Sequence, residues 1–156
     1  MKIHLPAYLP GVHRIEDTLS SKDLDLDPET FPGAIRAHLV LDRHDPYLQF
    51  EFNLGVTVRL DCDRCLAPYD SELEVKAPML YVMGRATADS PDDPEIVYLP
   101  AGAVDVDIST DLRDFIMLAV PSRRLCSEDC KGLCPSCGAD RNEQPCTCQP
   151  LTSDQL

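Results

Sequence analysis

The residues of this chain with the clearest chemistry are its eight cysteines, among 156 residues in total. Cys62 and Cys65 form one C-x-x-C motif, and Cys134 and Cys137 form a second, followed by Gly138. Two intervening residues let the backbone curl so that both thiolates reach one metal ion. We predict that all eight cysteines are ligands of structural zinc: Cys62, Cys65, Cys126, Cys130, Cys134, Cys137, Cys146 and Cys148.

Eight thiolates divide into two closed sites, because structural zinc takes four soft ligands in a tetrahedron. In the preferred partition one site contains Cys62, Cys65, Cys126 and Cys130, and the other contains Cys134, Cys137, Cys146 and Cys148. In the rival partition the two C-x-x-C motifs share one ion, as in a zinc ribbon. Both partitions stay open at this point, as does a single occupied site. The expected cofactor is therefore one or two zinc ions per chain.

The alternatives to zinc depend on the compartment and on local motifs. The first ten residues are interrupted by Pro6 and Pro10 and do not resemble a signal peptide, and no run of about 20 apolar residues could span a bilayer. We therefore expect a cytoplasmic protein without a membrane partner, in which disulfides do not persist. An iron–sulfur cluster is disfavoured because a local cluster-loading motif is absent. A thioredoxin-like redox site is disfavoured because Cys62 and Cys65 lie between two predicted strands.

Catalysis has little support in the sequence. There is no nucleophile elbow, P-loop or dinucleotide-binding fingerprint. Asp105 and Asp107 alternate on a predicted strand without a partner histidine or nucleophile, which indicates a solvent-exposed face. The four histidines have no ligand spacing and are expected to be ordinary surface or strand residues: His4, His13, His38 and His44. We expect a protein that is not an enzyme.

The net charge of −13 disfavours broad binding to nucleic acid, because acidic proteins repel phosphate. Residues 1–120 contain 10 Lys or Arg against 22 Asp or Glu, whereas residues 121–148 contain equal numbers. The pair Arg123–Arg124 is read as a solvated surface rather than a contact with nucleic-acid phosphates. Residues 84–95 are read as an acidic, solvated loop.

The cysteines must be positioned mainly by β-strands. Apolar and polar residues alternate most clearly over residues 48–54, which is typical of a half-buried strand. Further strands are expected from the same pattern or from short apolar runs at residues 35–41, 56–62, 71–77, 96–99 and 104–108. Two of these strands flank Cys62 and Cys65, so the motif is predicted at a hairpin tip. Residues 20–29 are read as a loop or a short helix.

One helix is expected near residues 111–120, capped by Ser109 and ended by Pro121. The segment that follows contains too few large apolar residues to build a core, so metal must order it. We therefore predict an α+β protein with a mostly antiparallel sheet, one main helix and a Cys-rich zinc-binding C-terminal segment. Its β-rich domain covers residues 1–120, with a zinc knuckle at 62–65, and its tail, residues 121–156, docks on that domain as a single structural unit.

Several of these segments together resemble a known family. They are Cys62-Asp-Arg-Cys65-Leu66, the helix Asp111–Val120 with Pro121, Cys130-Lys-Gly-Leu-Cys134-Pro-Ser-Cys137-Gly138, and Cys146-Thr-Cys148. The combination closely resembles the YceD family of bacteria and plastids over about residues 35–148. The resemblance implies a role in the accumulation of 23S ribosomal RNA, hence a non-enzymatic ribosome-biogenesis factor with a protein partner in large-subunit assembly. Direct contact with rRNA is disfavoured by the net charge.

Two other functions stay open at this stage. A zinc-ribbon module that binds nucleic acid directly would show steeply salt-dependent RNA binding. A thiol redox or zinc-sensing protein would need an accessible thiol of low pKa.

Overall fold

The computed structural model describes residues 1–86, 95–144 and 146–148. Most of the expected acidic loop, residues 87–94, lies outside this described part. The chain forms two compact units. Unit 1 contains Met1–Val58 and Glu72–Val120, and unit 2 contains Arg59–Ser71 and Pro121–Leu156. The segment Arg59–Ser71, with Cys62 and Cys65, and the Cys-rich tail therefore belong to the same unit, although residues 72–120 separate them in sequence.

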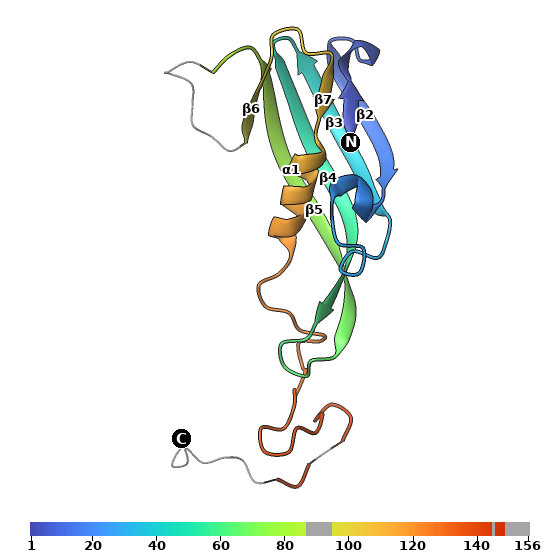
Figure 1. The fold of residues 1–156 in the computed structure, drawn as a ribbon, viewed down its shortest axis with the longest axis vertical. Coiled ribbons are helices and arrows are strands. Elements are labelled where there is room, and N and C mark those ends of the chain that lie inside the picture. The colour runs from blue at the N-terminus through green and yellow to red at the C-terminus, as the bar shows by residue number, and fades with distance from the viewer. Residues whose placement is uncertain (87–94, 145, 149–156) are drawn as a thin grey trace. The chain divides into compact units, whose positions relative to one another are not determined.

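A mostly antiparallel sheet is the main feature of the fold (Figure 1). Its strand order is β2 (Gly11–Leu19), β3 (Ile35–His44), β4 (Tyr47–Asp61), β5 (Pro68–Met83) and β6 (Ile96–Leu99). Strand β3 is antiparallel to both β2 and β4, whereas β6 is parallel to β5. A second sheet pairs β1 (Lys2–His4) with β7 (Asp105–Asp107). Two 3-10 turns, η1 (Leu5–Ala7) and η2 (Ser21–Leu24), and the helix α1 (Ser109–Ala119) complete the fold.

The core of unit 1 follows from strict alternation along β4. Leu48, Phe50, Phe52 and Leu54 are buried, whereas Gln49, Glu51 and Asn53 between them are exposed. This pattern arises because successive side chains of a strand point to opposite faces of the sheet. The α+β class and the mostly antiparallel sheet predicted from the sequence are thereby confirmed.

Helix α1 packs its apolar stripe against this sheet. Leu112 and Ile116 are fully buried, and Phe115 lies with its ring centroid 5.9 Å from that of Phe52. The buried Tyr81 on β5 donates a hydrogen bond to Asp111 in the first turn of α1, which anchors the helix to the sheet. Among the described residues, no helix is long and apolar enough to cross a membrane.

Strand β4 runs unbroken through Gly55, as the alternation that continues after this glycine indicates. A Cβ at Gly55 would lie 2.9 Å from the Arg36 guanidinium, so glycine makes room for that side chain. Local details differ from the sequence prediction in two places. Ser109 is the first helical residue and not the cap; its N–H donates to the carboxylate of Asp107 at 3.1 Å. Strands β1 and β2 were not predicted, because their residues are too exposed or too few to produce a clear pattern.

Phe50 provides a test of the unit 1 core. Its ring is fully buried and lies 5.4 Å from the ring of Tyr81 between centroids. We expect Phe50→Ala to lower the free energy of unfolding by about 3–5 kcal/mol, from lost apolar burial and the resulting cavity. Urea denaturation followed by circular dichroism measures this change. Glu51→Ala, at the neighbouring exposed position, is the control and should change stability by less than about 0.5 kcal/mol; equal effects at both positions would contradict the packing described.

Candidate metal centres

The turn between β4 and β5, residues 62–67, is called the hairpin tip. Its ends are closed by a hydrogen bond from the Cys62 N–H to the Ala67 carbonyl at 3.0 Å. A second bond, from the Leu66 N–H to the Cys62 carbonyl at 2.9 Å, tightens the turn. Leu66 adopts a left-handed backbone conformation with φ +60°, which reverses the chain immediately after Cys65. The turn therefore brings the thiols of Cys62 and Cys65 into one group.

The tail lies directly against the hairpin tip within unit 2. The Asp63 N–H donates to the Arg124 carbonyl at 2.7 Å, and the Arg124 N–H donates back to the Asp63 carboxylate at 2.7 Å. The Arg64 guanidinium donates to the Cys130 carbonyl at 2.7 Å. Gly132, with φ +69°, passes so close that a Cβ would lie 2.8 Å from the Arg64 carbonyl oxygen. These contacts bring Cys126 and Cys130 to the two cysteines of the turn.

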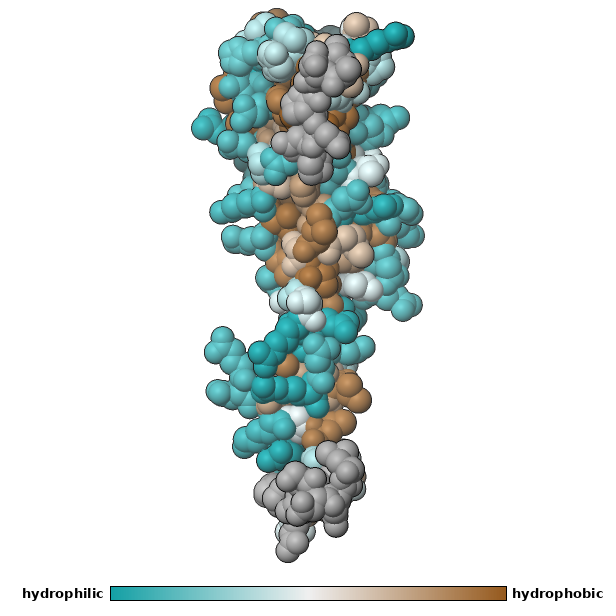
Figure 2. Space-filling model, turned by 90° about the vertical axis from the view of Figure 1, so that its left-hand side faces the viewer, coloured by the Kyte–Doolittle hydropathy of each residue, from teal (hydrophilic) through white to brown (hydrophobic). Residues whose placement is uncertain are grey.

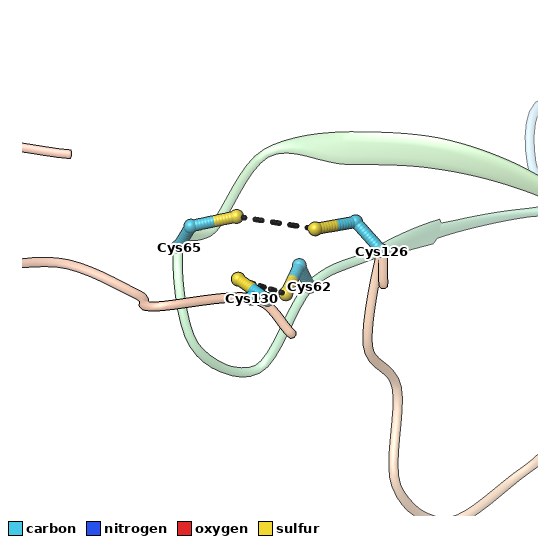
Figure 3. A group of neighbouring side chains, drawn as sticks. All are labelled: Cys62, Cys65, Cys126 and Cys130. Carbon is cyan, nitrogen blue, oxygen red and sulfur yellow. Dashed lines mark hydrogen bonds between the residues drawn. The ribbon is translucent and has the colours of Figure 1, made fainter. Parts of the chain in front are cut away.

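The first group of thiols has the dimensions of a tetrahedral metal site (Figure 3). The Sγ atoms of Cys62 and Cys130 are 3.8 Å apart, and those of Cys65 and Cys126 are 3.7 Å apart. All four sulfurs lie within 4.8 Å of one another. A tetrahedron with metal–sulfur bonds of about 2.3 Å has edges of about 3.8 Å. These distances are far longer than the roughly 2.05 Å of a disulfide. Four thiolates at this spacing can therefore hold one ion.

The second group forms inside the tail, from Cys134, Cys137, Cys146 and Cys148. Its turn is closed by hydrogen bonds from the Cys134 N–H to the Ala139 carbonyl and from the Gly138 N–H to the Cys134 carbonyl, both 2.8 Å. Gly138 has φ +73°, a conformation that favours glycine. These four sulfurs also lie within 4.8 Å of one another. Cys134 is buried, whereas Cys137 and Cys148 are exposed, so this second group is more open than the first.

The membership of the two groups is the same as in the preferred partition from the sequence. The two C-x-x-C motifs lie in separate groups and do not share one. Each group could hold a metal ion, and binding by the eight thiols remains a prediction.

Asn142 links the two groups and was not anticipated from the sequence. Its side-chain amide donates to the Cys130 sulfur at 3.4 Å, and its carbonyl oxygen accepts the Lys131 N–H at 2.7 Å. Its own backbone N–H donates to the Asp140 carboxylate at 2.8 Å, and Asp140 forms a β-bridge with Leu133. An amide that donates to a ligand sulfur orients it and offsets part of its charge. No motif identifies such a residue, because its role arises only from the folded loop.

Each group also contains a thiol that ionises easily. Backbone N–H groups, that of Cys126 first, lower the pKa of Cys62 to about 6. The N–H groups of Ser136 and Cys137 likewise lower the pKa of Cys134 to about 6. Donors of this kind stabilise the thiolate form, which is the form that binds metal.

Four other thiols resist ionisation, because their pKa values are raised: Cys65, Cys126, Cys146 and Cys148. At Cys65 the N–H of Ala67 favours the thiolate, but burial and the neighbouring thiols outweigh it and raise the pKa to about 12. At Cys148 the adjacent Cys137, together with burial, raises the pKa to about 12. Four thiolates in one small volume repel one another, and a divalent cation at the centre would remove that penalty.

The two aspartates and four histidines considered from the sequence belong to unit 1 and to neither group of thiols. Asp105 does have a partner histidine, contrary to the prediction, because β1 pairs with β7 and brings the His4 Nδ1 to 2.8 Å from its carboxylate. Both side chains are exposed, so the contact is a surface pair. Asp107 accepts hydrogen bonds from Ser109 at the start of α1. Among the described residues, no histidine joins a group with metal-binding geometry.

Comparison with known proteins places this arrangement in a family. The family model described as "Large ribosomal RNA subunit accumulation protein YceD" matches residues 50–156, which include all eight cysteines. The chain belongs to the YceD family. The resemblance noted from the sequence is thereby confirmed. No solved structure gives a significant match.

Several curated relatives share parts of this YceD-family chain. A maize protein named "Large ribosomal RNA subunit accumulation protein YCED homolog 1, chloroplastic" is 42% identical over 35% of this chain and 19% of its own length. The Arabidopsis thaliana protein of the same name is 35% identical over 33% of this chain and 16% of its own length. An uncharacterised Mycobacterium tuberculosis protein is 29% identical over 54% of this chain and 41% of its own. The chain thus matches less than half the length of each of these relatives.

The partition of the cysteines can be tested by substitution. Because Cys134 belongs to the second group only, we expect Cys134→Ser to reduce the metal content from two ions per chain to one. Elemental analysis combined with native mass spectrometry measures the content. Ser136→Ala, inside the same C-x-x-C motif, removes no thiol and should retain both ions. Loss of both ions from Cys134→Ser would instead indicate a site shared between the two motifs.

The raised thiol pKa values predict how metal affinity depends on pH. The pKa values of Cys65, Cys126, Cys146 and Cys148 are all raised above 9.0, so these thiols carry protons at pH 7. Metal binding must displace at least two protons per site, so affinity falls as pH falls. Between about pH 7 and 9, competition with a chromophoric chelator should show an affinity rising about a hundredfold per pH unit at each site. An affinity independent of pH would contradict ligation by these thiols.

Proposed function

We propose that this protein is a zinc-stabilised, non-enzymatic factor in the biogenesis of the large ribosomal subunit, which supports accumulation of 23S rRNA through protein contacts. The observation that carries the proposal is the position of the two tetrathiol groups inside the region matched by the YceD family model. The family description and the names of the plant relatives support the link to large-subunit rRNA.

Zinc is the metal that suits these sites best. Each group offers four thiolates that can reach one ion at the sulfur spacing of a tetrahedron. An iron–sulfur cluster places several irons and sulfides between its cysteines, so it needs a wider arrangement. Zinc also has no redox chemistry, which fits a structural role. One ion would join the hairpin tip to the tail, and the other would order the tail itself. Cytoplasmic thiols would remain reduced for this purpose.

The charge distribution supports a protein partner over RNA. Unit 1 contains 8 Lys or Arg against 19 Asp or Glu, so its surface repels phosphate and attracts basic polypeptides. In unit 2, Arg59 and Arg124 are paired with Asp70 and Asp63, which reduces the positive charge available to RNA. Helix α1 also exposes Met117 and Leu118, by 52% and 82%. Figure 2 shows exposed hydrophobic side chains on this side of unit 1, a surface suited to a protein contact.

Two other functions receive less support from the structure. A zinc ribbon pairs two C-x-x-C motifs around one ion, whereas here the motifs lie in separate groups. A redox or sensing role needs an accessible thiol of low pKa. The two thiols with lowered pKa, Cys62 and Cys134, are instead 0% and 5% exposed.

A deletion strain tests the function. We expect loss of the gene to lower 23S rRNA relative to 16S rRNA, measured by quantitative RNA electrophoresis. The wild-type protein should restore the ratio, whereas a Cys62→Ser/Cys65→Ser variant should not, because the first group of thiols loses two of its four cysteines. Ser127→Ala, which lies between Cys126 and Cys130 but removes no thiol, should restore it fully. An unchanged 23S to 16S ratio in the deletion strain would reject the proposed role.

A further inference from the structure

Strand β2 forms an outer edge of the five-stranded sheet. It pairs with β3 on one side over all nine of its residues, and no described strand pairs with its other side. For the described part of the chain, Figure 1 shows no helix or strand beyond it in that direction. An open strand edge presents a row of unpaired N–H and C=O groups, which can pair with a strand from another chain.

The orientation of the backbone groups on this edge can be derived. The Thr18 N–H donates to the Asp17 carboxylate at 2.8 Å and so is not part of the ladder with β3. In an antiparallel ladder, alternate residues direct both backbone groups to the same neighbour. Val12, Arg14 and Glu16 therefore share the outward direction of Thr18, whereas the odd-numbered residues pair with β3. The open edge offers four outward-directed residues.

The side chains of β2 are self-complementary about Ile15. If a second copy of β2 pairs antiparallel with its two-fold axis at Ile15, Arg14 lies opposite Glu16 of the other copy, and Glu16 opposite Arg14. In the same register His13 lies opposite Asp17, and Val12 opposite Thr18. Opposite charges placed directly across a strand pair are favourable. Arg14 and Glu16 of β2 therefore face opposite charges when the strand pairs with a second copy of itself.

Other symmetric registers lack this match. A two-fold axis at Arg14 places Arg14 of one copy opposite Arg14 of the other. A two-fold axis at Glu16 places Glu16 of one copy opposite Glu16 of the other. An axis at Asp17 sets two aspartates together, and one at His13 gives no opposite-charge pair. Like charges directly opposite are unfavourable, so charge alone selects the Ile15 register.

The selected register also satisfies the backbone. Arg14 and Glu16 both direct their N–H and C=O groups outward, so they can form a hydrogen-bonded pair across the axis. Ile15 then forms the central non-hydrogen-bonded pair, where side chains approach most closely, and its half-buried apolar side chain meets its own copy. Val12, which is 62% exposed in the single chain, gains a partner.

We propose that two copies of this protein associate through antiparallel β2 edges around a two-fold axis at Ile15, which joins their sheets into one. A second copy is the occupant because the charged side chains on the edge discourage strands of other sequence, while β2 itself provides the matching charges. A single strand pair is a small interface, so the dimer has a dissociation constant in roughly the micromolar range. The inference is independent of the proposed function and of the metal sites.

Sedimentation velocity of the full-length, metal-loaded protein tests the proposal. The wild type should show a monomer–dimer equilibrium between about 1 and 500 µM. Arg14→Glu turns both charge pairs at the axis into repulsive pairs and should weaken dimerisation about tenfold or more. The double variant Arg14→Glu/Glu16→Arg restores opposite charges with the net charge of the wild type, and should dimerise like the wild type. Lys76→Glu, an exposed reversal on the internal strand β5, is the control for net charge and should leave dimerisation unchanged.

Two outcomes overturn the proposal: a wild type that stays monomeric up to 500 µM, and a dimer that Arg14→Glu leaves intact. Loss of dimerisation in Arg14→Glu without recovery in the double variant overturns the Ile15 register. Circular dichroism confirms that every variant is folded before it is scored. As a second measure, Arg14→Pro removes one outward N–H without breaking the ladder to β3, and should also weaken the dimer.

Discussion

Mutual repulsion among converging thiolates is the constraint on which unit 2 depends. Its small core consists of Cys62, Cys65 and Cys130, with Ala67, Tyr69, Leu125 and Leu133 packed against it. So few apolar side chains cannot offset the conformational entropy lost when the tail is ordered. Cysteines make up most of this core, where leucines and phenylalanines make up the core of unit 1, and a bound cation would compensate the charge of their thiolates. Packing stabilises one unit, whereas coordination would stabilise the other.

Hydrogen bonds within unit 2 hold the tail against the hairpin tip, which brings the cysteines close together. Arg64 and Asp63 from the hairpin tip are both bonded to the tail, so the tail position does not rest on the thiols alone. Asn142 extends the arrangement by connecting the loop of the second group to a sulfur of the first. The hydrogen bonds fix where the sulfurs lie, and the ion would determine whether four thiolates can remain there.

The features that could be predicted from the sequence are those marked by a regular alternation of apolar and polar residues or by a regular spacing of cysteines. Strand β4 was evident because Phe50 and Phe52 alternate with polar residues, and the strands predicted on both sides of Cys62 and Cys65 located the hairpin tip. Strand β2 was missed because two of its half-buried positions are Gly11 and His13, so it has little apolar alternation. The role of Asn142 and the left-handed Leu66 could not be predicted, since each depends on contacts or turns formed only in the folded chain. The helix cap was assigned to Ser109 because serine favours that position, whereas the cap residue is Ile108 and the N–H of Ser109 donates to Asp107.

The separation of Cys65 from Cys126 by 61 residues also orders events during synthesis. At roughly 5–20 residues per second, the hairpin tip emerges from the ribosome several seconds before the tail that completes its group. Unit 1 can acquire its sheet in that interval, since its last residue, Val120, precedes every cysteine of the tail. Unit 2 can close only after Cys126 and Cys130 have also emerged. A chain truncated before Cys126 would therefore display two cysteines at the hairpin tip without their partners from the tail.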